Sequence, residues 1–545
     1  MQNRGKTDWH RAAEEGNFED FKKMYEKFSS GNRSNFDTVI NQRCSNNMTA
    51  LHYAAKNGHI EIVKFLLEET IGSNVEHSRG GRELPVLPIT HAAMNGHAEV
   101  VKYLLNRMKD KTKQEKMRKE MLLFAVRGGY LLDSMLAEVE AKDQAEVINK
   151  MLNEAAEWGR ITVMKALLGK LKDLEKSSNN NSNTETQKAK HSALREAIRH
   201  NKLNVVRYLI EEEGTININE KDFNGYTLLH DAANAEVYDA ENIVKFLLEK
   251  GADPTILNRY GESPLHYAIK NYNTVAILLA HKDVVNLPYT TAENMSPLHK
   301  LFADEKWRYK EKFKFKQVVK ALLENGADIN RKDAKGMTAL HYAITSTPEW
   351  ESDGAKMRML LDNSNGLDVN IPNNEGLTPL HFAARLGQAE SVKLLLEHGA
   401  DKALDLKTAT VEPPLRQAIE SCLNELEKKT SRAKKYREIV EVLLKFGADA
   451  SIVGNDGRSL LEIMQVHYDK YKDDFLVGND IKKIKKALEE QPKLSKEKET
   501  PEKPDNNKPE KTEIKETSSL VGRFFSLFNS ANREVNYSAS RQYKP

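Results

Sequence analysis

Histidine is the side chain in this sequence that could most readily bind a metal ion or transfer a proton. Seven of the 16 histidines recur once per repeated segment: His10, His52, His230, His266, His299, His341 and His381. Metal ligands must converge on one point, which residues spread over successive segments do not do. The spacing therefore predicts a structural role, in which each imidazole hydrogen-bonds between a turn and a helix. We expect no metal, cofactor or catalytic residue here.

The other reactive residue types form no catalytic pattern. Cys44 stands in a turn segment and Cys422 in the helical segment 417–429, and neither has the setting of a nucleophile. Gly80-Gly81 lacks the spacing of a phosphate-binding loop. Two cysteines in 545 residues exclude a disulfide framework and fit a reducing compartment. An enzyme site assembled in the irregular region 100–220 stays open as an alternative.

The elements that carry the histidines are paired helices, which the segment 376–401 (GLTPLHFAARLGQAESVKLLLEHGAD) shows most clearly. Thr378 stands where a helix N-cap belongs, and Pro379 takes the first helical position. Leu380 begins an i, i+3, i+4 apolar face, and Gly387 allows a left-handed exit from the first helix. Val392, Leu395 and Leu396 form the apolar stripe of the second helix. One helix pair cannot bury these stripes alone, so the pairs must stack.

Thirteen segments follow this pattern, and several are degenerate. Their marker residues are Trp9, Leu51, Ile89, Leu122, Leu152, Leu194, Leu229, Leu265, Leu298, Leu340, Leu380, Leu415 and Leu460. The Thr-Pro-Leu-His core and the period in the thirties resemble those of the ankyrin repeat. The resemblance implies an all-α solenoid of about 13 helix-turn-helix units, and composition predicts a disordered C-terminal tail after it. Solenoids of this kind bind proteins, so we expect a protein partner rather than a small-molecule substrate.

Composition shifts divide the chain. The segment from Gln491 to Thr517 is Lys, Glu, Pro and Asn with almost no apolar residue, so it cannot bury enough surface to fold. The expected organisation is 1–176, N-terminal repeats, partly degenerate; 177–190, a flexible Asn- and Ser-rich loop; 191–490, C-terminal repeats with insertions between paired helices; 491–517, a disordered charged linker; and 518–545, a short amphipathic segment and tail.

Insertions between the two helices of a repeat suggest a binding rim. Three repeats carry extra length at this point, and the inserted segments are rich in aromatic and basic residues. Aromatic and Arg side chains dominate binding hot spots. The hypothesis is a partner-binding rim made of Trp307, Arg308, Tyr309, Trp350 and Tyr436. The alternative is that the inserts extend helices and that their aromatic residues pack on their own repeat.

The turn tips that precede the first helices are the second candidate surface. Exposed Phe, Tyr and Met at such tips favour a partner. The predicted contact residues are Phe223, Tyr226, Arg259, Tyr260, Met295, Lys332 and Met337, with Lys335, Asn373 and Asn374 beside them.

Charge argues against nucleic acid as the partner. The net charge is +3, close to balance. The segment 106–120 is locally basic, which is typical of a solvated helix face; a contact with anionic lipid or RNA is the alternative. No stretch approaches the ~20 apolar residues of a membrane span. We expect a monomer.

Two further expectations concern the ends of the chain and a modification. The N-terminus has no hydrophobic segment of signal-peptide type, so we expect a cytosolic-type protein. The segment 322–330 resembles the ankyrin pattern that the asparaginyl hydroxylase of animal cells recognises. This resemblance implies Asn330 as a modified residue if the chain works inside an animal cell.

The C-terminal tail contains a narrow apolar stripe at helical spacing, made of Leu520, Val521, Phe524, Phe525 and Phe528. It could contact a membrane weakly, dock in a groove or act as a secretion signal. The architecture resembles the ankyrin-repeat effectors that intracellular bacteria deliver into host cells by type IV secretion. This resemblance implies a non-enzymatic scaffold that binds host proteins, with an export signal within 496–545. An endogenous cytosolic adaptor is the alternative.

Overall fold

The structure of the protein, a computed structural model, describes thirteen stretches of the chain. These are residues 6–29, 39–69, 87–177, 184–214, 216–234, 240–281, 284–287, 293–304, 312–346, 354–362, 366–408, 410–430 and 432–490. Every regular element within them is helical. The predicted linker and tail, 491–545, lie outside the described residues.

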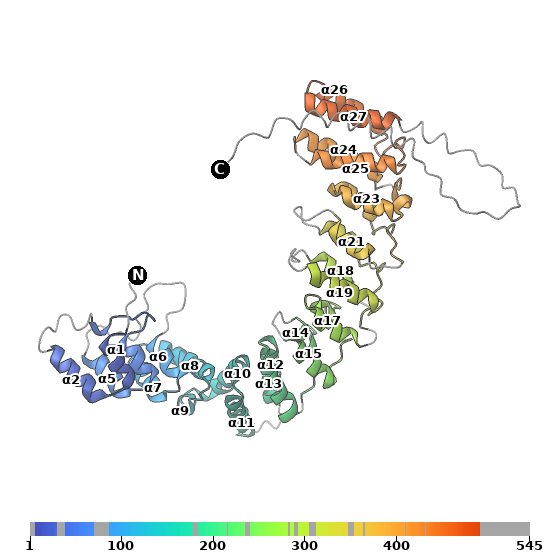
Figure 1. Cartoon of the computed structure of the whole chain (residues 1–545). Coiled ribbons are helices and arrows are strands. Elements are labelled where there is room, and N and C mark those ends of the chain that lie inside the picture. Colours follow the sequence, from blue (N-terminus) through green and yellow to red (C-terminus); the bar gives the residue numbers. More distant parts are fainter. Residues whose placement is uncertain are drawn as a thin grey trace. The chain divides into compact units, whose positions relative to one another are not determined.

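The helices of the described stretches form thirteen pairs, which we number as repeats 1 to 13, and each pair lies beside the next (Figure 1). Repeats 1 to 4 are α1 (Asp8–Glu15) with α2 (Phe18–Ser29), α4 (Ala50–Lys56) with α5 (Ile60–Glu69), α6 (Pro88–Met94) with α7 (Ala98–Asn106), and α8 (Lys111–Gly128) with α9 (Asp133–Leu136). Repeats 5 to 8 are α10 (Ala141–Trp158) with α11 (Ile161–Ser177), α12 (Thr184–Arg199) with α13 (Leu203–Arg207), α14 (Leu228–Ala233) with α15 (Ala240–Glu249), and α16 (Pro264–Ala268) with α17 (Tyr272–Leu279). Repeats 9 to 13 are α18 (Pro297–Ala303) with α19 (Lys312–Glu324), α20 (Ala339–Thr345) with α21 (Ala355–Leu361), α22 (Pro379–Leu386) with α23 (Ala389–Glu397), α24 (Pro414–Glu427) with α25 (Ala433–Lys445), and α26 (Leu460–Tyr471) with α27 (Phe475–Glu490).

The predicted fold is confirmed, because every marker residue lies in the first helix of one of these pairs. The local signals act as expected in repeat 11. Thr378 is the N-cap of α22, Pro379 is its first residue, and Gly387 ends it with φ at 74°. Leu380 is fully buried, which stabilises a packed side chain by about 1.5–3 kcal/mol.

One continuous cluster of buried apolar side chains runs through the stack from Trp9 to Leu488. First helices pack against first helices, as in α1 on α4, α4 on α6 and α20 on α22. No repeat has a core of its own. Stability is therefore shared between neighbours, as expected for a one-dimensional stack.

Repeats 4 to 6 depart from the pattern at their first helices. α8 begins at Lys111, well before the marker Leu122, whereas α22 begins one residue before its marker. The segment KTKQEKMRKE contains strong helix formers and no Gly or Pro, so helix replaces the turn that other repeats place there. A π-helical turn (Tyr208–Glu212) extends α13, and a 3-10 turn (Ala400–Ala403) follows α23.

The loop expected over 177–190 is shorter than predicted. Helix α12 already begins at Thr184, and Lys190 is buried. The Thr186 hydroxyl and backbone N–H donate to the Glu175 carboxylate at 2.5 and 2.8 Å, and the Lys190 ammonium lies 2.9 Å from Glu213. These contacts fix a segment whose composition alone predicted a loop.

Candidate functional site

The repeated histidines join neighbouring repeats through hydrogen bonds. In repeat 8, the Nδ1 atom of His266 accepts from the Ser263 backbone N–H at 2.9 Å, and its Nε2–H donates to the Met295 carbonyl of repeat 9 at 3.0 Å. His10, His230, His299, His341 and His381 make the same pair of bonds. We call this set of bonds the histidine ladder. The predicted structural role is confirmed for these residues.

The ladder requires neutral imidazoles, because one ring nitrogen accepts while the other donates. Burial lowers the pKa of His230, His266, His341 and His381 to about 4, and it also lowers the pKa of His299. At neutral pH these rings are therefore uncharged.

Arginine takes the ladder position in two repeats. Arg195 donates to the Tyr226 carbonyl at 2.8 Å, and Arg416 donates to the Arg458 carbonyl at 2.8 Å. The guanidinium of Arg416 is buried and also lies 2.7 Å from the Asp456 carboxylate. Hydrogen bonds from the backbone and side chain of Arg458 lower the pKa of Asp456 to about 2, and the Arg416 charge adds to the effect. Both arginines directly follow a marker leucine, as the ladder histidines do, so their place in the repeat was visible in the sequence, whereas their hydrogen-bonding role was not predicted.

A second set of contacts joins repeats where their first helices end. His59 donates to the Glu14 carbonyl at 3.1 Å, and His97 donates to the Lys56 carbonyl at 2.9 Å. Arg160 donates to the Arg127 carbonyl at 2.6 Å. Each side chain thereby caps the C-terminus of the preceding first helix, where carbonyls lack partners inside the helix.

Tyr436 belongs to this second set, which corrects its predicted role in partner binding. Its side chain is only 8% exposed, and its hydroxyl donates to the Arg385 carbonyl at 2.8 Å. The insertion before it lengthens α24 to Glu427 rather than forming an exposed loop. The helix extension of the alternative is present here, but Tyr436 packs on the preceding repeat rather than on its own.

The other predicted rim residues, Trp307, Arg308, Tyr309 and Trp350, lie outside the described residues. Two aromatic residues of the first insert are described. Phe313 is 74% exposed at the start of α19, whereas Phe315 is buried edge-on against Phe302, with ring centroids 5.2 Å apart.

Three of the predicted turn-tip residues form one exposed group. Phe223 is 88% exposed in repeat 7, and Tyr260 is 52% exposed in repeat 8. Arg259 lies between them: its backbone N–H donates to the Asn224 carbonyl at 2.9 Å, and its guanidinium donates to the Asn224 side chain at 3.1 Å. The guanidinium carbon is also 5.7 Å from the centre of the Tyr260 ring. We call Phe223, Arg259 and Tyr260 the tip patch.

Other tip residues have packing roles. Met337 is buried, and its carbonyl is a ladder acceptor for His299, so its prediction as an exposed contact was wrong. Met295 is half-buried and is the acceptor for His266. The half-buried Tyr226 shares a 2.8 Å hydrogen bond with Tyr267.

At the tips of repeats 10 and 11, three predicted residues are exposed and one is not. Lys332, Lys335 and Asn374 are exposed, whereas Asn373 is buried. The Asn373 side chain accepts from the Glu375 and Leu377 backbone N–H groups at 3.0 and 2.9 Å, which fixes the shape of this turn.

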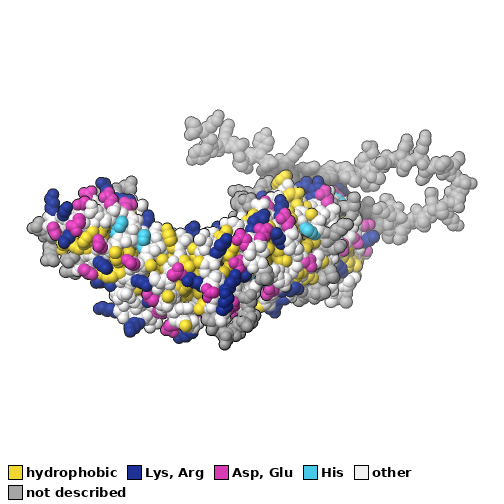
Figure 2. Space-filling view, turned by 90° about the horizontal axis from the view of Figure 1, so that it is seen from below, with side chains coloured by type: hydrophobic (Ala, Val, Ile, Leu, Met, Phe, Trp, Pro, Cys, Tyr) yellow, Lys and Arg dark blue, Asp and Glu magenta, His cyan; other side chains and the backbone are white. Residues whose placement is uncertain are grey.

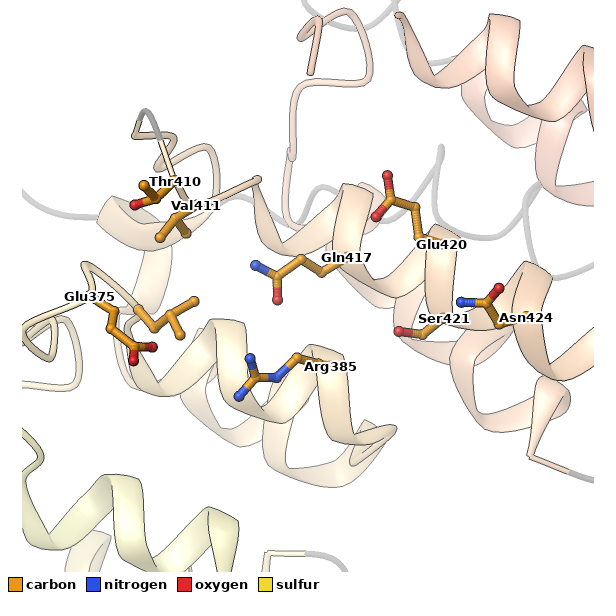
Figure 3. A pocket seen from close by; sticks show the side chains of 9 residues that line it. Glu375, Arg385, Thr410, Val411, Gln417, Glu420, Ser421 and Asn424 are labelled. Carbon is orange, nitrogen blue, oxygen red and sulfur yellow. The ribbon is translucent and has the colours of Figure 1, made fainter. Parts of the chain in front are cut away.

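A cleft of about 560 Å³ lies between repeats 11 and 12. It is lined by Glu375, Leu377, Arg385, Thr410, Val411, Gln417, Glu420, Ser421 and Asn424. Figure 3 shows Arg385 of α22 and Gln417 of α24 reaching into the space between the two helices.

The cleft offers both a hydrogen-bond acceptor and a cation. The side-chain oxygen of Gln417 is buried without a partner among the described residues. Arg385 lies over the Phe382 ring, 4.9 Å from its centre, and no described carboxylate pairs with it. Both residues lie in first helices: Gln417 directly follows the ladder position Arg416, and Arg385 lies four residues after His381.

Asn330, the predicted modification site, bridges two repeats. Its side-chain amide donates to the Gly366 carbonyl at 2.7 Å and accepts from the Asp368 backbone N–H at 2.9 Å. Asn219, Asn286 and Asn370 each donate to a glycine carbonyl of the following repeat in the same way.

Charge is mixed along the stack. Figure 2 shows Lys and Arg side chains interspersed with Asp and Glu over the viewed face. In the basic segment 106–120, Arg118 pairs with Glu115 at 3.1 Å and Lys119 with Asp143 at 2.6 Å, while Lys111, Lys113 and Lys116 are exposed. The described residues include neither a group of three potential metal ligands nor a helix long and apolar enough to cross a bilayer.

Comparison with known proteins agrees with this architecture. A family model described as ankyrin repeats (3 copies) matches residues 9–115, 152–258, 237–303 and 311–405, together more than half of the chain. Phosphocholine transferase AnkX of Legionella pneumophila is 30% identical over 142 residues, which are 25% of this chain and 15% of that protein. An ankyrin repeat protein of Rickettsia felis is 31% identical over 147 residues, 26% of this chain and 62% of that protein.

Among solved structures, the ankyrin repeat domain of Bcl-3 matches 46% of this chain and 96% of that domain, with 24% identity and a TM-score of 0.36. The chain spans less than two thirds of the length of the two curated relatives named above. The family match covers the helix pairs of repeats 1 to 3 and 6 to 11, including all seven of the repeated histidines. The chain therefore belongs to the ankyrin-repeat family.

Proposed function

We propose that this chain is a non-enzymatic scaffold that binds a protein partner through two neighbouring surfaces. These are the tip patch and the solvent-facing side of the first helices of repeats 7 to 12, which we call the inner face. Ankyrin repeats are typically interaction modules, which supports the class of function. The observation that carries the choice of surface is the exposure of Phe223, 88%, beside Tyr260 and Arg259. A large apolar side chain so exposed at a turn tip contributes nothing to packing, whereas aromatic and Arg side chains dominate hot spots.

The inner face extends this surface toward the C-terminal repeats. Tyr267 is half-buried, with the Lys300 ammonium 5.0 Å from its ring centre, and Arg385 covers the buried ring of Phe382. The cleft beside Arg385 offers room for a side chain of the partner. A protein laid across the turn tips and first helices would contact Tyr267, Lys300 and Arg385.

The binding proposal is tested by replacing Phe223 and Tyr260 together with alanine. Each hot-spot aromatic residue contributes about 2 kcal/mol, so affinity for a captured partner should fall at least roughly tenfold. Both side chains are exposed, so the unfolding midpoint should stay unchanged. The measurement is affinity capture followed by titration of the captured protein.

The matched control is Val466→Ala, which removes a 58% exposed apolar side chain from α26, away from the tip patch. The control should bind like the unaltered chain. Equal affinity of the double variant and the control would contradict the proposed surface.

We further propose that the chain is a bacterial effector delivered into host cells, with an export signal in 496–545. Similarity to ankyrin proteins of Legionella pneumophila and Rickettsia felis supports this proposal. An endogenous cytosolic adaptor is the second candidate. A translocation reporter fused to the chain lacking residues 496–545 should not reach host cells, whereas the full-length fusion should. Delivery of the truncated fusion would contradict an export signal in this segment.

A further inference from the structure

Repeats 3 to 5 expose three large side chains where their first helices end. Met94 ends α6 and is 37% exposed, Tyr130 follows α8 and is 46% exposed, and Trp158 ends α10 and is 47% exposed. These repeats lie outside the surface proposed above. One large side chain from each of three consecutive repeats suggests a continuous feature.

Contacts between repeats show that these residues lie in one row. Tyr130 covers Gly96, two residues after Met94: a Cβ atom at Gly96 would lie 2.6 Å from the Tyr130 ring. Arg160 covers Gly129 in the same way, and Lys202 covers Gly159, each 3.7 Å from such an atom. In each of these repeats, a side chain just after the first helix packs over the glycine that follows the first helix of the preceding repeat. We call the row Met94, Tyr130, Trp158, Arg160 and Lys202 the N-terminal rim.

The rim is held in position by hydrogen bonds. The Trp158 indole N–H donates to the Glu154 carboxylate at 3.0 Å, and the same carboxylate pairs with Arg127. Arg160 donates to the Arg127 carbonyl from Nε and an Nη at 3.0 and 2.6 Å. A fixed indole loses little conformational entropy when a partner covers it, which favours binding.

Charge on the rim is unbalanced. Among the described residues, no carboxylate pairs within 4.0 Å with Arg160 or Lys202, nor with the exposed Lys56 of repeat 2, whose carbonyl meets His97. Glu154 is already paired with Arg127, and the half-buried Glu157 directly precedes Trp158 in the chain. Arg160 and Lys202 are half-buried and Lys56 is exposed. A partner segment that carries carboxylates would give these cations the ionic partners that they lack.

We infer that the N-terminal rim is a second docking site and that it takes an acidic peptide segment with apolar or aromatic anchors. Tyr130 and Trp158 supply the apolar contacts, and Arg160, Lys202 and Lys56 receive the carboxylates. Interfaces enriched in Tyr, Trp, Met and Arg have this composition. Electrostatic complementarity selects the acidic partner over a basic one.

The test is selection of a random peptide library displayed on phage against the full chain, followed by binding of the selected peptides to a Tyr130→Ser, Trp158→Ser variant. Peptides that require the rim should lose at least roughly tenfold in affinity in the variant. They should carry more Asp and Glu than Lys and Arg, and their affinity should fall as salt rises. They should bind unchanged to the Phe223→Ala, Tyr260→Ala variant, so failure of this inference is distinguishable from failure of the proposed function.

The matched control is Leu386→Ser, which changes a 46% exposed side chain at the end of α22 in repeat 11. Circular dichroism of the variants checks that the helices persist. Arg160→Gln is a milder second variant, which should lower the affinity of acidic peptides and leave that of other peptides unchanged. Absence of rim-dependent peptides, or a basic or uncharged set of them, would overturn the inference. So would binding of anionic lipid vesicles that the rim variant abolishes while peptide binding persists.

Discussion

Lowering the pH from 7 to 5 should destabilise repeats 7 to 11 strongly, because the histidine ladder must stay neutral. Four ladder imidazoles, of His230, His266, His341 and His381, have a pKa of about 4 in the folded chain against an ordinary value of 6.5. Between these values the unfolded chain binds more protons, so the free energy of unfolding falls as pH falls. Each of the four imidazoles should lower the free energy of unfolding by about 1.4 kcal/mol for each pH unit of acidification in this window. Guanidinium unfolding at pH 7, 6 and 5 measures the effect.

The control for the pH effect is His266→Gln, whose amide can still donate to the Met295 carbonyl but does not titrate. This variant should show a pH slope that is shallower by about one proton. Carboxylates act in a different window: the half-buried Glu213, whose pKa is lowered to about 2 by Lys190, Lys172 and Tyr208, loses its contribution to the free energy of unfolding only below about pH 4.5. An identical slope for the variant and the unaltered chain would show that the ladder does not set the pH dependence.

Replacing Gly128 with alanine should destabilise repeats 3 and 4 more than other glycine-to-alanine changes inside helices. A Cβ atom at Gly128 would lie 1.8 Å from the Met94 carbonyl oxygen, which is backbone and cannot rotate away. The helices α6 and α8 would have to separate, and overpacking of this kind costs about 3 kcal/mol. Urea unfolding should show a lower midpoint, and hydrogen exchange should quicken first in α6 and α8.

The matched control is Gly169→Ala in α11, where a Cβ atom meets nothing within 4 Å. That change should stabilise the helix by about 0.5–1 kcal/mol, because alanine has a higher helix propensity than glycine. Similar midpoints for the two variants would contradict the close approach of α6 and α8.

Much of the fold could be predicted because each repeat carries local signals. Thr378 and Pro379 begin α22, Gly387 ends it, and the apolar stripe of Leu380 identifies its buried face. The histidines were predicted as structural because one per repeat cannot converge on a metal. The signals weakened in repeats 4 to 6, where helix propensity replaced the turns.

The binding surface was harder to predict, because exposure depends on contacts between repeats. Tyr436 on the predicted rim and Met337 at a turn tip were expected to be exposed like Tyr260, yet the first caps a preceding helix and the second is buried. The Cβ-less glycine that receives Tyr436 lies in another repeat, at Gly387. Cleft residues such as Gln417 were missed for the same reason, since two repeats are needed to form the cleft.

The central claim is that partner recognition occurs on the turn tips and inner helices of a stack whose ladder histidines are purely structural. Hydrogen–deuterium exchange of the full chain, free and bound to its captured partner, tests it most directly. The claim predicts slower exchange in 221–226 and 257–263 and along α22 and α24, with no change in the second helices α15, α17 and α23. Protection confined to those second helices would contradict it.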